Sequence, residues 1–252
     1  VAKKMNIKVI HVEGGIRSWD LTMPEEINRM VTDSISDYFF TTSTTANNNL
    51  MQIGVRKEKI FFVGNTMIDT LMKHSENFIK PNLWEKLGLK EKNYIVMTLH
   101  RPLNVDQKNM LGNLIYEIVY HSQNMPIVFP VHPRTVKQLE LSNISHKNLH
   151  VVEPMTYLEF NYLVKKSKAV ITDSGGITEE TTVFNIPCIT LRDNTERPET
   201  VKYGTNELIG SGTENIQTNL KKLLSGNWKK GSIPELWDGK TAERIVSHIL
   251  EF

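Results

Sequence analysis

The segment Thr172–Glu199, TDSGGITEETTVFNIPCITLRDNTERPE, contains residue types that can hold a nucleoside diphosphate. A strand that ends in Ser-Gly-Gly (174–176) and leads into a helix presents free backbone N–H groups at the positive end of a helix dipole, which suits a phosphate. Glu180 lies in the first turns of that helix and could reach a ribose hydroxyl. Arg197 follows the next strand and could clamp the diphosphate. The segment therefore predicts a nucleoside diphosphate site.

Two carboxylates follow the first predicted strand of the chain. Glu13, in HVEGGIRSWD, comes directly after that strand, and Glu25, in MPEEINR, lies at a helix start. Ligands of open α/β sheets bind at the carboxyl ends of strands, although a turn acid or a first-turn acid explains each residue in isolation. Removing and returning a proton at carbon needs a pair of acid–base groups that face the same atom. The pair therefore indicates proton transfer.

Two further strand ends are basic, and one predicted helix is aromatic. His100 in TLHRPLNVD and His132 in VFPVHPRT each follow a strand, where a histidine can protonate or neutralise a leaving phosphate. A solvated loop histidine is the commoner interpretation of either one alone. Tyr157 and Phe160 could flank a base, although ordinary core packing also explains aromatic residues at helical spacing.

Short apolar strands alternate with amphipathic helices, which is typical of βαβ units and a parallel sheet. The pattern predicts strands at Lys8–Val12, Tyr38–Thr41, Ile60–Val63, Tyr94–Leu99, Ile127–Val131, Leu149–Val152, Ala169–Thr172, Cys188–Leu191 and Glu207–Ile209. It predicts helices at Pro24–Asp33, Thr44–Ile53, Met67–His74, Met110–Ser122, Thr135–Leu141, Tyr157–Lys166, Ile177–Phe184, Asn215–Leu224 and Ala242–Leu250. The polar stretch His74–Asn93 is the best candidate for an interdomain linker.

Composition excludes several other classes of protein. A chain of 252 residues with 39% hydrophobic content can form one large or two modest domains, and a net charge of +2 does not indicate nucleic acid. The single cysteine, Cys188, excludes an intrachain disulfide and a cysteine-based zinc site, and the histidines lack metal-site spacing. P-loop, dinucleotide-fingerprint and nucleophile-elbow motifs are missing. Without a long apolar run or a signal peptide, we expect a cytoplasmic protein that does not enter a membrane.

Seven motifs, in their order along the chain, resemble the non-hydrolysing UDP-N-acetylglucosamine 2-epimerases: HVEGGIRS, MPEEINR, GNTMIDTL, TLHRP, PVHPRT, TDSGGITEE and RDNTERPE. The resemblance extends from His11 to DGKTAERI (238–245). It implies an α/β fold with two Rossmann-like domains in the glycosyltransferase-B arrangement. The implied parts are a partial N-terminal domain (1–77), a UDP-binding domain (78–236) and a C-terminal helix that crosses back to the first domain (237–252).

The resemblance also implies roles for individual residues. The implied catalytic residues are Glu13, Glu25 and His100, and which glutamate is the base stays open. The implied UDP-binding residues are Ser174, Gly175, Gly176, Glu180, Arg197, Phe160 and His132. The partner would be a UDP-sugar, with no cofactor and no metal, and the family allows a homodimer.

The expected function is interconversion of UDP-GlcNAc and UDP-ManNAc, by elimination and re-addition of UDP, for surface polysaccharide synthesis. Members of the family carry about a hundred further residues before the HVEGG strand, by comparison of domain sizes. We therefore expect an incomplete first domain with a hydrophobic sheet edge and slow or absent turnover. Three alternatives remain: an epimerase of the same family that acts on a decorated UDP-sugar such as a diacetamido-uronate, a hydrolysing 2-epimerase, and a UDP-sugar-binding module without turnover.

Overall fold

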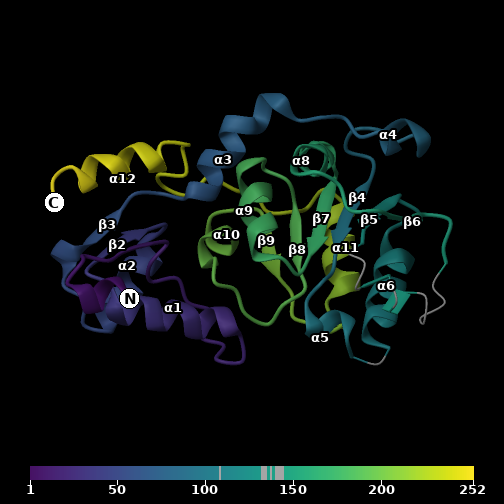
Figure 1. Ribbon diagram of the computed structural model, residues 1–252. Coiled ribbons are helices and arrows are strands. Elements are labelled where there is room, and N and C mark those ends of the chain that lie inside the picture. The colour runs from purple at the N-terminus through teal and green to yellow at the C-terminus, as the bar shows by residue number, and fades with distance from the viewer. Residues whose placement is uncertain (108, 132–134, 137, 140–144) are drawn as a thin grey trace. The chain divides into compact units, whose positions relative to one another are not determined.

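The computed structural model describes residues 1–252 except 108, 132–134, 137 and 140–144. The chain divides into two compact units (Figure 1). Unit 1 comprises Val1–Glu76, Asn194–Tyr203 and Ile233–Phe252, and unit 2 comprises Asn77–Asp193 and Gly204–Ser232. This division differs from the expected boundaries, because the segments 194–203 and 233–236 belong to unit 1.

Unit 1 is built on a parallel sheet in the order β1-β2-β3. Its strands are β1 (Ile10–Val12), β2 (Tyr38–Thr41) and β3 (Ile60–Phe62), and its helices are α1 (Pro24–Ile35), α2 (Thr44–Gln52), α3 (Thr66–His74), α10 (Pro198–Lys202) and α12 (Thr241–Ile249). The helix starts follow from local chemistry. Pro24 begins α1, and the Ser43 hydroxyl caps α2 by accepting a hydrogen bond from the Ala46 N–H.

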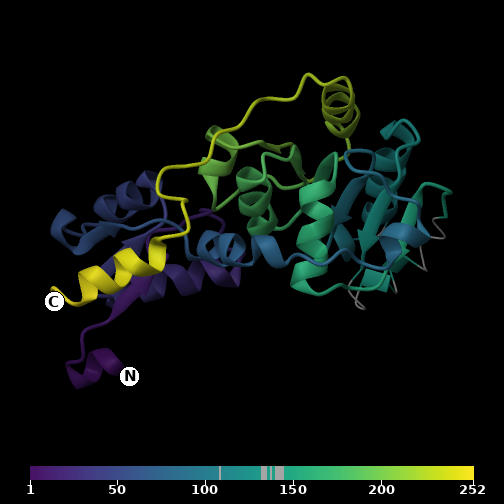
Figure 2. The ribbon, with the colours of Figure 1, turned by 90° about the horizontal axis from the view of Figure 1, so that it is seen from above.

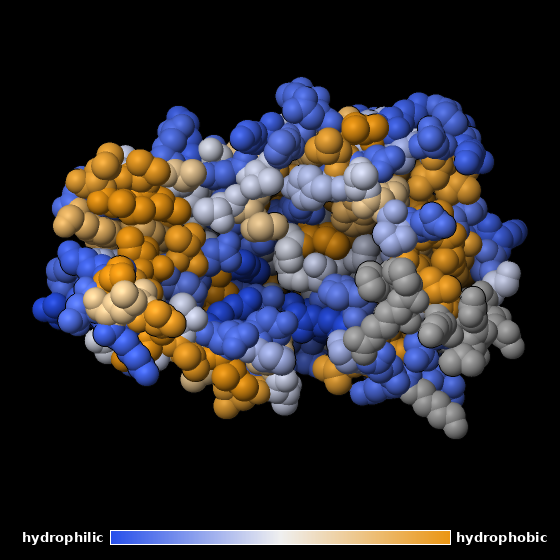
Figure 3. Space-filling view, viewed as in Figure 1, coloured by the Kyte–Doolittle hydropathy of each residue, from blue (hydrophilic) through white to orange (hydrophobic). Residues whose placement is uncertain are grey.

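The C-terminal helix of unit 1 packs on the sheet and on α3. His248 lies against Phe40 and Phe61, and Phe252 stacks on Tyr38. Figure 2 shows α12 lying over the strands of this unit. Large apolar side chains remain exposed on this unit, among them Val246 and Leu250, and Figure 3 shows apolar surface over it. In the described residues, no helix has the length and apolar run needed to cross a membrane.

Unit 2 contains a six-stranded parallel sheet in the order β6-β5-β4-β7-β8-β9. Its strands are β4 (Ile95–Thr98), β5 (Ile127–Pro130), β6 (Leu149–Val152), β7 (Ala169–Thr172), β8 (Cys188–Thr190) and β9 (Asn206–Leu208). Its described helices include α4 (Leu83–Lys86), α5 (Pro102–Val105), α6 (Met110–His121), α8 (Tyr157–Lys166), α9 (Gly175–Val183) and α11 (Ile216–Leu224).

Both faces of this sheet are buried, which explains its continuous apolar strands. Successive residues of one strand enter different cores: Ile95 packs with residues of α6 and α11, whereas Val96 packs with Leu163 and Val164 of α8. Because the strands are parallel, all of them end at the same edge, and the loops that leave that edge carry the candidate site residues of unit 2.

Each predicted strand is present, with bounds within two residues of the prediction. The short helices α4, α5 and α10 were not predicted, and α9 begins at Gly175 rather than at Ile177. The predicted helix Thr135–Leu141 lies partly outside the described residues.

Candidate functional site

Glu13 of unit 1 is held in a strained backbone conformation, and an arginine from far along the sequence contacts its carboxylate. It directly follows β1 and has a backbone φ of 64°, in the left-handed region that few residues with side chains adopt. Its Oε2 accepts a hydrogen bond from Arg197 Nη2 at 3.0 Å, and its Oε1 accepts one from the Thr66 hydroxyl at 3.3 Å. Backbone strain of this kind persists where the surroundings enforce it and concentrates at functional sites. The structure thus pairs two predicted site residues that are 184 positions apart.

A buried aspartate fixes the turn that carries Glu13. The Asp33 carboxylate contacts His11 Nδ1 at 2.6 Å and accepts hydrogen bonds from Arg17 Nη2 at 2.5 Å and from the Gly15 N–H at 3.2 Å. Burial raises the pKa of Asp33, but hydrogen bonds and charges from His11 and Arg17 outweigh it, so the pKa lies below its ordinary value of 3.8. Asp33 therefore stays ionised and holds both sides of the turn. The sequence interpretation missed it.

The two glutamates at the start of α1 have different environments. Glu26 is fully buried and accepts hydrogen bonds from the Ser18 N–H at 2.9 Å, the Ser18 hydroxyl at 3.0 Å and the Trp19 N–H at 3.1 Å. Glu25 is exposed, and no described residue gives its carboxylate a hydrogen bond. The Glu26 carboxylate is thus occupied by the preceding loop, whereas Glu25 is the member of the pair that can meet a ligand.

In unit 2, a buried aspartate orients His100. Nδ1 of His100 lies 2.8 Å from Oδ1 of Asp173, and the same carboxylate accepts hydrogen bonds from the backbone N–H groups of His100 and Arg101 and from Asn104 Nδ2. Burial raises the pKa of Asp173, yet His100 and the surrounding donors outweigh burial and lower it. The His100 side chain is 55% exposed. Asp173 thereby fixes the ring by Nδ1 and leaves Nε2 for a ligand. The sequence interpretation did not assign Asp173 a role.

The start of α9 is an open helix N-terminus at the carboxyl end of β7. Ser174 is the N-cap residue, but its hydroxyl makes no capping hydrogen bond, and its N–H donates to the Thr172 hydroxyl at 2.9 Å. A side chain added at Gly176 would meet no atom within 4 Å. The first N–H groups of a helix have no carbonyl partner within the helix, so the start of α9 suits an anion.

Glu180 lies on the inner side of α9. Its side chain is buried and accepts a hydrogen bond from Asn161 Nδ2 at 3.4 Å, and Tyr157 is a second hydrogen-bonding neighbour. Burial raises the pKa of Glu180 to about 7, against the opposing effect of Asn161 and Tyr157. Asn161, which the sequence interpretation missed, lies one turn of α8 beyond Tyr157.

Phe160 and His100 line one pocket of unit 2, with a volume of about 510 Å³. Met155 and Pro130 add to its apolar wall. A mostly apolar wall with a few polar groups, here Thr98 and His100 among the described residues, is typical of a small-molecule site. Predicted residue His132 lies outside the described residues. Arg197 belongs to unit 1, whereas Ser174 belongs to unit 2, so a phosphate role for Arg197 stays a prediction.

Comparison with known proteins gives a consistent result. The sequence profile of the family described as UDP-N-acetylglucosamine 2-epimerase matches residues 1–250. A relative from Methanocaldococcus jannaschii, named UDP-N-acetylglucosamine 2-epimerase, is 42% identical over 98% of this chain and 69% of its own length. UDP-2,3-diacetamido-2,3-dideoxy-D-glucuronate 2-epimerase from Pseudomonas aeruginosa is 35% identical over 88% of this chain and 64% of its own length.

A solved structure agrees with these relatives in fold. The crystal structure of the M. jannaschii UDP-GlcNAc 2-epimerase in complex with UDP-GlcNAc and UDP matches with a TM-score of 0.83 at 41% identity, over 98% of this chain and 71% of that one. The predicted α/β class, with parallel sheets as in the glycosyltransferase-B-like epimerases, is thereby confirmed. By profile, identity and fold, the chain belongs to the UDP-N-acetylglucosamine 2-epimerase family.

Proposed function

We propose that this protein interconverts UDP-GlcNAc and UDP-ManNAc by elimination and re-addition of UDP. Membership of the family supports the reaction class, and the names of the relatives at 42% identity support the substrate. The structural observation that carries the proposal is Glu13, a carboxylate on a strained turn, paired with Arg197 and held by a buried network.

Unit 2 would hold the nucleotide. The open N-terminus of α9, at Ser174–Gly176, would bind the diphosphate, and Glu180 would accept hydrogen bonds from the ribose hydroxyls. Phe160 would lie against the uracil, in the pocket that it shares with His100. His100, fixed by Asp173, would donate to the diphosphate through Nε2 as negative charge develops there.

Unit 1 would move the proton. The C2 proton of an acetamido sugar is not next to a carbonyl, so its removal must be coupled to departure of the C1 substituent. A carboxylate takes the proton from C2, the C1–O bond breaks with its electrons going to UDP, and the remaining electron pair forms the C1–C2 double bond of a 2-acetamidoglucal. Returning a proton to the other face of C2 and UDP to C1 gives the epimer. Glu13 and Glu25 are the proposed proton-handling pair, in either order.

Nuclear magnetic resonance of the chain with UDP-GlcNAc in D₂O tests the proposal. We expect UDP-ManNAc anomeric signals to appear, together with loss of the C2 proton signal from both sugars. For Glu→Gln changes at Glu13 or Glu25, Glu58→Gln is a matched control, because Glu58 is an exposed glutamate outside the site. This control variant should behave like the wild type.

The same spectra separate the competing functions. Free ManNAc and UDP would identify a hydrolysing enzyme. Turnover of a UDP-diacetamido-glucuronate without turnover of UDP-GlcNAc would favour the second relative's activity, which the lower identity of 35% supports less. Binding of UDP in calorimetry without any change in either sugar would identify a binding module and overturn the proposed reaction.

A further inference from the structure

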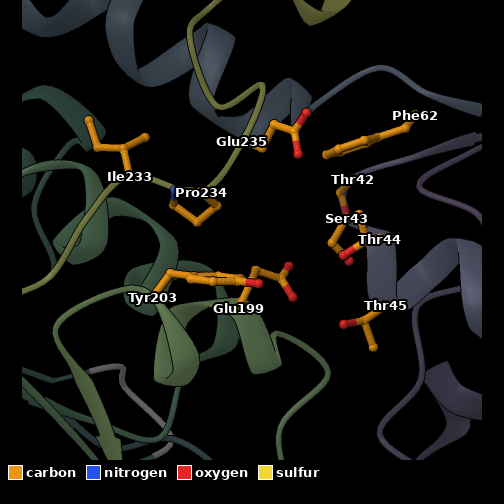
Figure 4. A pocket seen from close by; sticks show the side chains of 10 residues that line it. All are labelled: Thr42, Ser43, Thr44, Thr45, Phe62, Glu199, Tyr203, Ile233, Pro234 and Glu235. Carbon is orange, nitrogen blue, oxygen red and sulfur yellow. The ribbon is translucent and has the colours of Figure 1, made fainter.

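A second pocket lies within unit 1 (Figure 4). Its lining includes the four hydroxyl side chains of Thr42–Thr45, here called the hydroxyl row, and Glu199 and Tyr203 of α10 and its C-cap. Residues of the segment that leads to α12 complete it. Its volume is about 230 Å³, below the roughly 300–1,000 Å³ of pockets for drug-sized ligands. The pocket therefore suits a ligand of about one ring. It lies outside the proposed reaction, because neither Glu13 nor Glu25 lines it.

Two buried polar atoms in this pocket have no hydrogen-bond partner among the described residues. Glu199 is only 4% exposed, and its Oε2 has no hydrogen-bond partner among the described residues. The hydroxyl of Thr42, a residue that is 2% exposed, likewise has none within the described part of the chain. Figure 4 shows the Glu199 carboxylate pointing from α10 toward the hydroxyl row. A buried polar group without a partner is costly, so these two atoms indicate a ligand that supplies hydrogen bonds.

The charges around the pocket disfavour both phosphates and cations. Among the described residues that line it, none is basic and two are acidic, Glu199 and Glu235, so a diphosphate would meet two carboxylates and no cationic side chain of the lining. A cation would instead meet the positive end of the α2 dipole, because the hydroxyl row forms the start of that nine-residue helix. A neutral ligand that both donates and accepts hydrogen bonds satisfies both sides.

The remaining walls are flat and apolar. The rings of Tyr203 and Phe62 face the pocket, and Ile233 and Pro234 complete this side (Figure 4). A pyranose ring has an apolar C–H face and a polar edge of hydroxyls, which matches aromatic walls opposite a hydroxyl row. We propose that this pocket binds a neutral monosaccharide, with its ring against Tyr203 and its hydroxyls shared between Glu199 and the hydroxyl row.

Saturation-transfer NMR with free N-acetylglucosamine tests the proposal, using the full chain saturated with UDP. We expect saturation transfer to the sugar, and Tyr203→Ala should raise the dissociation constant about threefold to tenfold through loss of the aromatic wall. Tyr203→Phe keeps the ring and should restore binding. Tyr203 is 43% exposed, so its replacement leaves the core intact. Tyr120→Ala, which changes an exposed tyrosine of α6, is the matched control.

Glucosamine, the cationic counterpart of the same sugar, separates a neutral site from a cation site. We expect it to bind more weakly than N-acetylglucosamine. Tighter binding of glucosamine, an unchanged dissociation constant in Tyr203→Ala, or no saturation transfer in the wild type would each overturn the proposal. UDP affinity should be the same in Tyr203→Ala and the wild type, so failure here is distinguishable from failure of the proposed epimerase reaction.

Discussion

Asp33→Asn should loosen the turn that carries Glu13. The Asp33 side chain is fully buried and connects His11, Arg17 and the Gly15 N–H. Loss of one partner of a buried ion pair costs about 3–5 kcal/mol. Asparagine keeps one acceptor oxygen, so we expect about 2–4 kcal/mol of lost stability in unit 1. A neutral side chain also leaves the Arg17 guanidinium, whose side chain is 2% exposed, without its charge partner.

Hydrogen-exchange mass spectrometry of peptides from β1 and α1 measures this loss within unit 1. A change of 2–4 kcal/mol corresponds to about 30- to 900-fold faster exchange. The folded pKa of Asp33 lies below its ordinary value, so its contribution is present above pH 3.8 and is lost as pH falls through the folded pKa. The difference between wild type and variant should therefore shrink below pH 3.8. Asp106→Asn, in unit 2, is the control. Exchange within twofold of the wild type in Asp33→Asn would show that Asp33 does not hold the turn that carries Glu13.

Two further predictions concern α9 and α12. Because burial raises the pKa of Glu180 to about 7 from its ordinary value of 4.5, its proton stabilises the folded state below pH 4.5, and this stabilisation is lost as pH rises through 7. Glu180→Gln should therefore raise the melting temperature of unit 2, and the rise should be larger above pH 7 than at pH 4.5. The same variant should bind UDP more weakly in calorimetry. An equal rise in melting temperature at both pH values would contradict this prediction. Asp69 accepts hydrogen bonds from the Thr241 and Ala242 N–H groups at 3.1 and 2.7 Å, so Asp69→Ala should destabilise the start of α12 by about 1 kcal/mol. Hydrogen exchange of the α12 amides measures this destabilisation. Equal exchange in Asp69→Ala and Asp69→Asn would show that the Asp69 side chain does not cap α12.

The strands were predictable because their burial leaves a local pattern. In β7, Ala169, Val170 and Ile171 are apolar on both faces of a sheet that is covered on both sides, and such runs stand out between polar loops. The short helices α5 and α10 leave almost no periodicity over four and five residues. Their only local signal is a proline at the first helical position, which also fits a turn.

The candidate site was predictable where its groups are neighbours in one short motif, as at Ser174–Gly176. It was not predictable where a partner comes from far along the chain. Arg197 meets Glu13 across 184 positions, and the buried role of Asp33 depends on two residues in the preceding strand and loop. Adjacent acids pose a related problem, because Glu25 and Glu26 differ only in the helix face that they occupy, and burial decides which one meets solvent.

The most direct test of proton transfer by Glu13 is exchange of the C2 proton of UDP-GlcNAc with D₂O, followed by NMR in the wild type and in Glu13→Gln. We expect C2 exchange in the wild type. In Glu13→Gln we expect exchange to fall by at least about 100-fold, with UDP affinity in calorimetry within about threefold of the wild type. Exchange at the wild-type rate in Glu13→Gln would contradict the assignment of proton transfer to the turn that follows β1.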